Sequence, residues 1–119
     1  MKKITIAVAI LLVIGVVAGV ATRSLDKSRR VFNGFCEAIR LGDFGRAQTY
    51  IAPGLLAQNS NHVWVVHMVN GDMPAERFAV AQVKKVRRSR ERDIVIFSMS
   101  SKGDMAHIEG GKITYVKCP

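Results

Sequence analysis

The sequence predicts an α+β protein, with an N-terminal transmembrane helix followed by two helices packed on a curved antiparallel sheet of about five strands. Residues 4–22 are uncharged and mostly apolar, residues 24–51 carry apolar side chains at helical spacing, and from His62 onward the period changes to two. With 119 residues, a charged fraction of 23% and an apolar fraction of 49%, the composition is that of a small globular protein and argues against wholesale disorder. We expect a segment 1–23 that is an anchor or signal, and one small domain over 24–119.

The N-terminal segment begins with Met-Lys-Lys, and the 19 residues from Ile4 to Thr22 carry no charge. As an α-helix this run is about 28 Å long, close to the thickness of a bilayer core. A signal peptide has a shorter apolar region, so we expect a retained single-pass anchor that contacts the bilayer through residues 4–22. The alternative is cleavage near Ala21, after Gly19-Val20-Ala21, which would release a secreted domain.

Basic residues flank the apolar run on both sides, so the positive-inside rule is nearly balanced. A very short basic tail before a long apolar run is nevertheless the usual layout of a secreted or anchored chain. We therefore expect a single-pass protein of the inner (cytoplasmic) membrane whose domain faces the periplasm or exterior.

The chain has two cysteines, Cys36 early in the domain and Cys118 next to the last residue. In an oxidising compartment a disulfide between them would close a loop of roughly 80 residues and stabilise the domain by up to about 4–5 kcal/mol. Two free thiols, one of them buried, are the alternative. The spacing permits the disulfide and does not require it.

The first domain helix is expected over residues 24–41. Four side chains on it form one apolar stripe at i, i+3, i+4 and i+7: Phe32, Phe35, Cys36 and Ile39. Gly42 is a suitable residue to end the helix, and Gly34 weakens its middle by about 1 kcal/mol relative to alanine. Asp43 is a good N-cap for a second, short helix that ends at Pro53-Gly54.

A polar connector, residues 58–61, leads to the sheet. We expect strands over residues 62–69, 77–87, 93–101, 105–109 and 112–117, joined by short turns rich in Gly, Asn, Asp and charged residues. The second of these strands changes its inward parity near Gln82, which suggests a bulge. The third is apolar on both faces over residues 94–97, as a central strand would be.

The segment Phe32-x-x-Phe35-Cys36-x-Ala38-Ile39-x-x-Gly42-Asp43-Phe44-x-x-Ala47-x-x-Tyr50-Ile51-x-Pro53 resembles the opening of the nuclear-transport-factor-2-like, cystatin-like superfamily. The resemblance implies helices packed on a curved, meandering sheet, as in membrane-anchored bacterial members. That superfamily contains cavity enzymes such as ketosteroid isomerase, and also non-enzymatic periplasmic domains of secretion-system subunits. It often forms homodimers through the exposed sheet face, for which Trp64 and Phe97 are candidates here, although each alone fits core packing.

Catalytic and metal-binding chemistry are not indicated. His62 and His67 are five residues apart, so on a strand they point to opposite faces. The carboxylates of the sheet region sit at or next to turns, and no Tyr/Asp or His/Asp pair is clearly placed toward a cavity. We predict no catalytic residues, no metal site and no cofactor.

The strongest local signal is a basic stretch between two predicted strands: Lys84, Lys85, Arg87, Arg88, Arg90 and Arg92. The whole chain has 18 Lys and Arg against 9 Asp and Glu, a net charge of +9. The stretch could bind anionic lipid headgroups, another polyanion or an acidic partner. It has no interleaved aromatic residues, which argues against nucleic acid. The simplest alternative is a solvated hairpin whose charges prevent edge pairing.

Together these patterns predict a membrane-tethered, non-catalytic, extracytoplasmic protein-interaction or assembly module, such as an accessory subunit of an envelope or secretion complex, acting through a protein partner or as a homodimer. Three alternatives remain. The first is a small-ligand-binding or isomerase-like cavity protein, and the second is a polyanion binder that uses the basic hairpin. The third is a pilin-like subunit, although the prepilin Gly-Phe boundary is absent.

Overall fold

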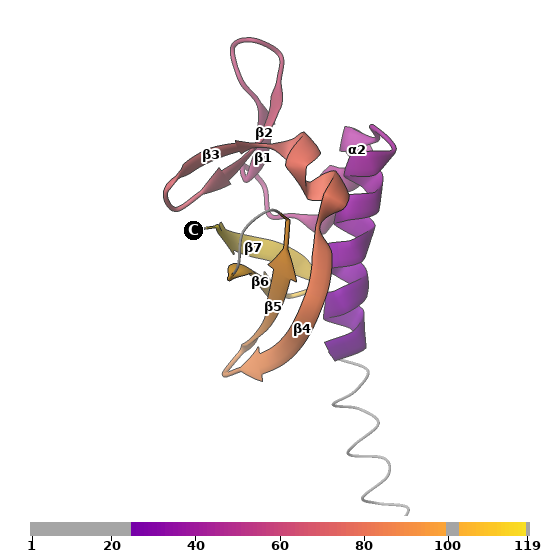
Figure 1. Cartoon of the computed structure of the whole chain (residues 1–119), viewed down its shortest axis with the longest axis vertical. Coiled ribbons are helices and arrows are strands. Elements are labelled where there is room, and N and C mark those ends of the chain that lie inside the picture. The colour runs from indigo at the N-terminus through magenta and orange to yellow at the C-terminus, as the bar shows by residue number, and fades with distance from the viewer. Residues whose placement is uncertain (1–24, 100–102, 119) are drawn as a thin grey trace, which may run out of the picture.

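The computed structural model describes residues 25–99 and 103–118, and the predicted anchor from Ile4 to Thr22 lies outside them. Among the described residues, no helix combines the length and the apolar character that crossing a membrane requires. The domain has the predicted α+β class, with helices packed against antiparallel sheets (Figure 1). Residues 25–99 and 103–118 form seven strands in two sheets, where the sequence predicted about five in one.

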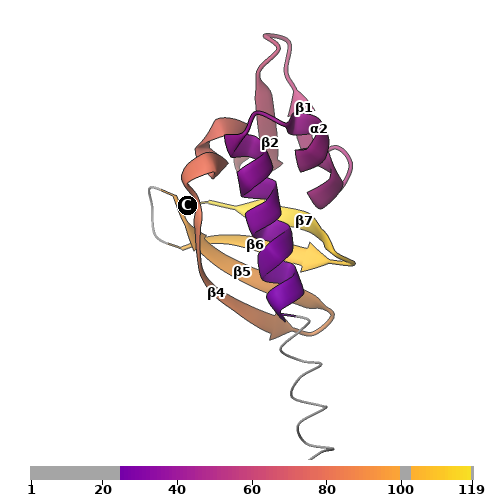
Figure 2. The same ribbon diagram turned by 90° about the vertical axis from the view of Figure 1, so that its right-hand side faces the viewer.

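The larger sheet has the order β4-β5-β6-β7, and every pairing in it is antiparallel. Its strands are β4 (Gln82–Ser89), β5 (Arg92–Ser98), β6 (Asp104–Glu109) and β7 (Lys112–Lys117). The smaller sheet has the order β1-β2-β3 and consists of β1 (Leu56–Gln58), β2 (Trp64–Met68) and β3 (Gly71–Pro74). The N-terminal helix lies across the larger sheet, and the smaller sheet stands at the opposite end from the first described residue (Figure 2).

The N-terminal helix, described over residues 25–40, buries the predicted stripe: Phe32, Phe35, Cys36 and Ile39 are each at most 4% exposed. Phe32 packs on Phe97 of β5, and Phe35 meets Phe78 edge-on. The helix ends as predicted at Gly42, whose φ is +72°. There the Asp43 N–H donates to the carbonyl of Ala38, and the Gly42 N–H donates to the carbonyl of Ile39, which together make a Schellman motif.

Asp43 then caps the second helix, because its side chain accepts a hydrogen bond from the Arg46 N–H. This helix is short: α2 (Phe44–Ala47) is followed at once by the 3₁₀ turn η1 (Gln48–Tyr50). Ile51 then forms a parallel bridge to Ile113 of β7.

Two stretches of the sheet region differ from the prediction. The strand expected from residue 77 begins only at Gln82, because η2 (Ala75–Val80) is a 3₁₀ helix that buries Ala75 and Phe78. Strand β1 was not predicted and has only Gln58 within the expected connector, and the turn expected at residues 70–72 contains the start of β3. Both are very short strands without alternation, so period-two patterning could not find them. The hairpin turns at residues 90–91 and 110–111 are where the sequence predicted them.

The register of the larger sheet separates its two faces. On the inner face Val86, Val95, Ala106 and Val116 form one cross-strand row, and the last three are buried under the helix. On the outer face Arg87, Ile94, His107 and Tyr115 form a row. The predicted bulge is present close to Gln82, between Val83 and Lys85. As predicted for a central strand, β5 is apolar on both faces.

Candidate functional site

The basic hairpin consists of β4, a turn at residues 90–91 and the start of β5. All six of its predicted basic residues are exposed: Lys84, Lys85, Arg87, Arg88, Arg90 and Arg92. The bulge leaves both Lys84 and Lys85 exposed and breaks strict alternation, so that only residues 83, 86 and 89 are partly buried along β4. Among the described strands β4 pairs only with β5, so it is an edge strand of this sheet, and its charges also discourage pairing with another sheet.

Two of these basic residues are partly neutralised. Arg88 Nε lies 3.5 Å from Oδ1 of the buried Asp93. Arg92 approaches Glu109 at 3.8 Å and also donates from Nη1 to Nδ1 of His107 at 3.2 Å. Burial, and then the nearby Arg92, lowers the pKa of His107 from its ordinary value, while Glu109 acts in the opposite direction.

Basic side chains of the N-terminal helix and of the hairpin lie where the described chain begins. Residue 25 and the β4–β5 turn are at the same end of the domain in both views (Figures 1 and 2). The β6–β7 turn lies beside the helix, because a Cβ on Gly111 would be 3.7 Å from Lys27 Cε. A shallow cavity of about 170 Å³ joins them, lined by Lys27 and Ser28 of the helix, Arg88, Glu91 and Asp93 of the hairpin, and Ile108, Gly110 and Gly111. We call this part of the surface the basic end, and its seven Lys and Arg are Lys27, Arg29, Arg30, Arg87, Arg88, Arg90 and Arg92.

The helix is held to the basic end by one buried hydrogen bond. Ser28 Oγ donates to Asp93 Oδ2 at 2.5 Å across 65 positions of sequence, and both residues are about 95% buried. Asp93 Oδ1 has no hydrogen-bond donor among the described residues and lies 3.5 Å from Arg88 Nε. Nothing in the sequence indicates this contact, because it depends on the angle at which the helix crosses the sheet.

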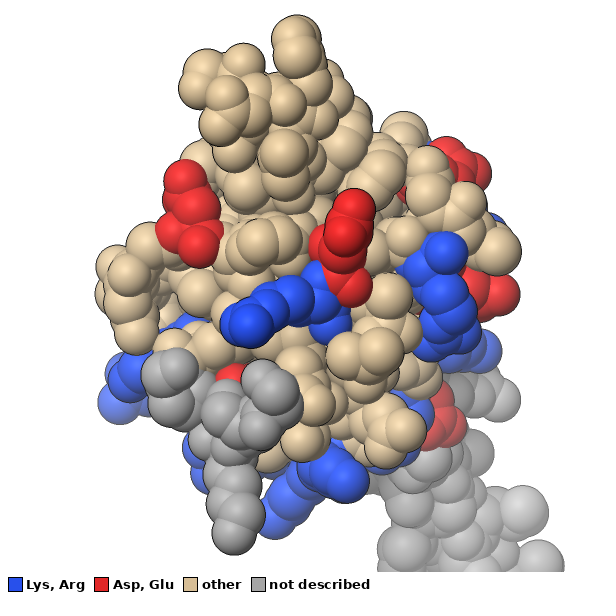
Figure 3. Space-filling view, turned by 45° about the horizontal axis from the view of Figure 1, so that its top comes forward, with Lys and Arg blue, Asp and Glu red and all other residues tan. Residues whose placement is uncertain are grey.

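The opposite end of the domain has a different character. The β1–β2 loop, residues 59–63, projects beyond both sheets and contains no Lys, Arg, Asp or Glu. In the space-filling view this projection is entirely tan, whereas blue side chains gather lower on the same face (Figure 3). The charge of the domain is therefore concentrated away from this loop.

The two residues considered for an exposed sheet face are both elsewhere. Phe97 is 1% exposed and packs between Phe32 and Phe78, so it belongs to the core. Trp64 is partly buried and stacks on Phe44 of α2, with ring centroids 5.0 Å apart. The outer face of the larger sheet is made by other residues: Ile94, Ile96, Met105, His107 and Tyr115. All but Ile94 are partly exposed, and the ring of His107 stacks on that of Tyr115 with ring centroids 4.4 Å apart.

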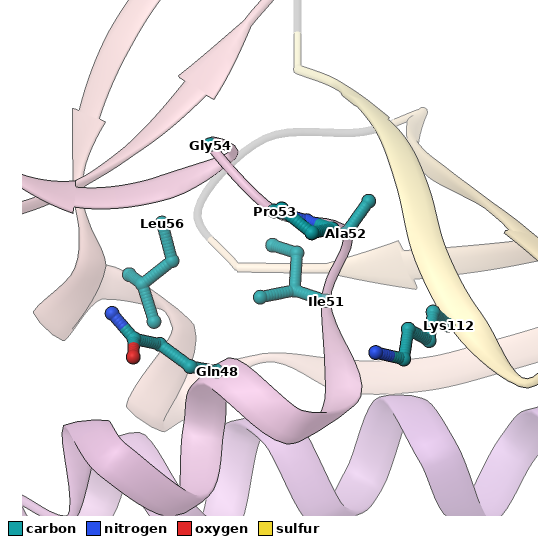
Figure 4. A pocket seen from close by; sticks show the side chains of 7 residues that line it. All are labelled: Gln48, Ile51, Ala52, Pro53, Gly54, Leu56 and Lys112. Atoms are coloured by element: carbon teal, nitrogen blue, oxygen red, sulfur yellow. The ribbon is translucent and has the colours of Figure 1, made fainter.

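Two open grooves lie near the smaller sheet. One, of about 320 Å³, runs between η1, the following loop and Lys112, and no acidic side chain lines it (Figure 4). The other, of about 230 Å³, lies between β2 and β7 and is mostly apolar, with His67, Thr114 and Tyr115 among its lining. Neither groove is an enclosed cavity of the kind that an isomerase-like site would need.

His67, which lines the second groove, belongs to a histidine–carboxylate pair that the sequence did not predict. His67 Nδ1 donates to Asp72 Oδ1 at 2.5 Å across the β2–β3 turn, and both side chains are about half exposed. Cross-strand register explains the pair, since His67 is directly opposite Asp72. The turn at residues 70–71 was the signal that could have found it. No group of three or more His, Cys, Asp or Glu that could hold a metal occurs within residues 25–99 and 103–118.

Both cysteines are buried in the core as free thiols, and the structure has no bond between them. Burial raises the pKa of Cys36 to about 12. Burial together with the neighbouring Asp104 carboxylate raises the pKa of Cys118 to about 12 as well. Neither thiol has the electropositive, partly exposed surroundings of a reactive cysteine. The predicted Cys36–Cys118 disulfide remains a prediction.

Comparisons of the chain with protein-family models, with curated proteins and with solved structures find no match. No family assignment follows from them.

Proposed function

We propose that this protein is a membrane-tethered, non-catalytic module that acts by protein contact outside the cytoplasm. The observation that carries the proposal is the order of two features along the chain. An uncharged run of 19 residues, long enough to span a bilayer, is followed directly by a domain whose first described helix starts at its most basic end. A domain attached in this way projects its uncharged β1–β2 loop away from the point of attachment.

Protein contact fits the surfaces better than catalysis does. The outer face of the larger sheet carries a partly exposed row of Ile96, Met105, His107 and Tyr115, flanked by basic residues of β4. Such a mixed apolar and aromatic surface is typical of interface cores. A homodimer through this face is the form that the nuclear-transport-factor-2-like resemblance implies. The helix–Gly42–Asp43–helix segment supports that resemblance, and the division of the strands into two sheets departs from it.

A pair of C-terminal reporter fusions tests the side of the membrane. One reporter is active only after export, and the other fluoresces only in the cytoplasm. We expect the exported reporter to be active and the cytoplasmic one to be silent. A matched variant with Val13→Lys and Val17→Lys, which breaks the apolar run, should reverse both signals. Activity of the cytoplasmic reporter on the unmodified chain would reject the proposed orientation.

The second candidate function is binding of a small ligand in the groove between β2 and β7. The observation in its favour is the His67–Asp72 pair, in which the carboxylate orients an imidazole that lines a mostly apolar groove. A thermal-shift screen with small apolar ketones and carboxylic acids tests it. A ligand that stabilises the chain but not a Val69→Arg variant would support this function. Stabilisation that Val69→Arg leaves unchanged would reject the groove as the binding site.

A further inference from the structure

The basic end combines three features: exposed cations, incomplete neutralisation and a fixed position at the start of the described chain. Of its basic residues, Arg88 and Arg92 have carboxylate partners at 3.5 and 3.8 Å. Arg30, Arg87 and Arg90 are exposed and have no ion pair with any residue that the structure describes. They come from two elements far apart in sequence, the N-terminal helix and the β4–β5 hairpin, which the fold brings to one end (Figures 1 and 2).

We propose that the basic end binds the headgroups of anionic phospholipids and thereby holds the domain upright on the membrane. This inference rests on the proposed tether, which places that end within reach of the leaflet. The buried hydrogen bond between Ser28 and Asp93 fixes the helix to the hairpin, so the two elements that carry the cations keep a constant position relative to each other at this end. The uncharged β1–β2 loop is then directed away from the bilayer, toward a partner.

An anionic leaflet fits this surface better than the other polyanions do. The stretch 84–92 contains no aromatic residue on which a nucleic-acid base could stack. The cations form no deep pocket that would select one phosphate, since the cavity beside Arg88 is small, open and also lined by Glu91 and Asp93. A broad, shallow basic surface matches the diffuse negative potential of a leaflet, which extends for only about 8 Å at physiological salt.

The expected effect is large enough to measure. A Lys or Arg close to an anionic leaflet strengthens binding about five-fold. Removing Arg30, Arg87 and Arg90 should therefore weaken the docked state on the order of 100-fold. Raising the salt concentration should weaken it as well, because these side chains remain exposed to solvent.

The experiment uses the full chain in lipid nanodiscs with an environment-sensitive fluorophore on Glu91→Cys, at the exposed hairpin turn. Both native cysteines are buried, so labelling is selective for the new thiol. The readout is quenching by a lipid that carries a quencher on its headgroup. We expect strong quenching in phosphatidylglycerol, little in phosphatidylcholine, and loss of the difference at high salt.

A matched pair of triple variants isolates the basic end. Arg30→Gln, Arg87→Gln and Arg90→Gln should abolish the phosphatidylglycerol-dependent quenching. The control removes the same charge elsewhere, with Arg46→Gln on α2, Arg77→Gln on η2 and Lys117→Gln at the far end of β7, and should leave the quenching intact. Equal quenching in both lipids, or equal loss in both variants, would overturn the proposal. The proposal would also be overturned if the fluorescence did not depend on the lipid but changed saturably when polyglutamate was added. That result would indicate an acidic protein partner.

Failure of the tether is distinguishable from failure of the lipid contact. If the chain leaves the nanodisc without detergent, the proposed function fails. Co-flotation with phosphatidylglycerol vesicles then tests the basic end alone, with the same two triple variants. Lipid binding is supported if the parent and the control variant float and the variant of the basic end does not. It is rejected if neither the parent nor either variant floats.

Discussion

At the scale of single residues, Gly34 shows how a residue that weakens a helix stabilises the fold. A Cβ at this position would lie 2.7–2.9 Å from the ring of Tyr50, which packs directly against the helix backbone. In an isolated helix Gly34→Ala would gain about 1 kcal/mol. Here we expect a net loss of about 1–3 kcal/mol in the free energy of unfolding, because the ring must move out of a packed site.

Urea unfolding of Gly34→Ala checks this expectation. The double variant Gly34→Ala with Tyr50→Ala should recover part of the stability lost by Tyr50→Ala alone, because the added methyl group no longer meets a ring. If Gly34→Ala stabilises the unaltered chain, the close approach of Tyr50 is wrong.

The Ser28–Asp93 hydrogen bond gives a second prediction. Ser28→Ala removes the hydrogen bond to Oδ2 of a buried carboxylate whose Oδ1 has no donor among the described residues, so we expect a loss of about 1–3 kcal/mol. A double-mutant cycle with Asp93→Ala should give a coupling energy of about 0.5–3 kcal/mol. Additive effects of the two substitutions would show that the residues do not interact.

The lowered pKa of His107 predicts that the stability of the domain depends on pH. Its folded-state pKa is lowered, chiefly by burial and then by Arg92, so the unfolded chain takes up its proton at a higher pH than the folded chain does. The contribution of His107 to stability is therefore complete above about pH 6.5 and is lost as the pH falls below that value. Melting temperatures between neutral pH and pH 5.5 should fall less steeply for His107→Gln than for the parent.

A matched control for this pH profile is His62→Asn. His62 is exposed and has a φ of +61°, a conformation that asparagine tolerates. We expect the slope of melting temperature against pH to be the same as in the parent. An identical slope in His107→Gln would contradict the account of the His107 environment.

The cysteines give a prediction that also tests the disulfide. Because burial holds both pKa values near 12, we expect the native thiols to react slowly with iodoacetamide at neutral pH and quickly after unfolding. A chain with the disulfide has two hydrogens fewer than a chain with two free thiols, so intact mass under non-reducing conditions distinguishes them. Rapid alkylation of the folded chain would contradict the burial of both thiols.

At the scale of the elements, the helix exit at Gly42 determines how the chain turns toward α2. Gly42 has a φ of +72° and open space around its missing side chain, so only backbone strain opposes a substitution. We expect Gly42→Ala to cost about 1–2 kcal/mol and Gly42→Asn to cost less. Gly45→Ala within α2 is the control, since its φ is not positive, and it should be neutral or stabilising. Equal effects at both glycines, read from urea unfolding, would exclude the Schellman turn.

The elements also show which features are readable from sequence. The helix stripe, the Gly42-Asp43 junction and the turns at residues 90–91 and 110–111 follow from local chemistry, and each was predicted. The 3₁₀ segment Ala75–Val80 was not, because Phe78 and Val80 have the spacing of a strand, and only Phe78 is buried by tertiary packing. The same limit applies to the basic end: its hairpin was predicted, whereas its junction with the helix through Ser28 and Asp93 depends on long-range geometry.

At the scale of the whole molecule, charge is distributed unevenly between the two ends of the domain. Cations from the first helix and from the β4–β5 hairpin gather where the described chain begins, and an uncharged loop projects at the opposite end. The N-terminal apolar run therefore precedes the end of the domain that we propose binds lipid headgroups. Stability then depends mainly on the aromatic core around Phe32, Phe78 and Phe97, and the basic end remains available for binding.

Extraction of native membranes tests the central claim of this account, the tether formed by residues 4–22. Membranes containing the full chain are washed with alkaline carbonate, and the pellet and supernatant are compared by immunoblot, with the mass of the retained chain measured afterwards. We expect the chain to stay in the pellet with its N-terminus uncut, and to be released only by detergent. Recovery of an uncut chain in the carbonate supernatant would contradict the tether, and with it the proposed function.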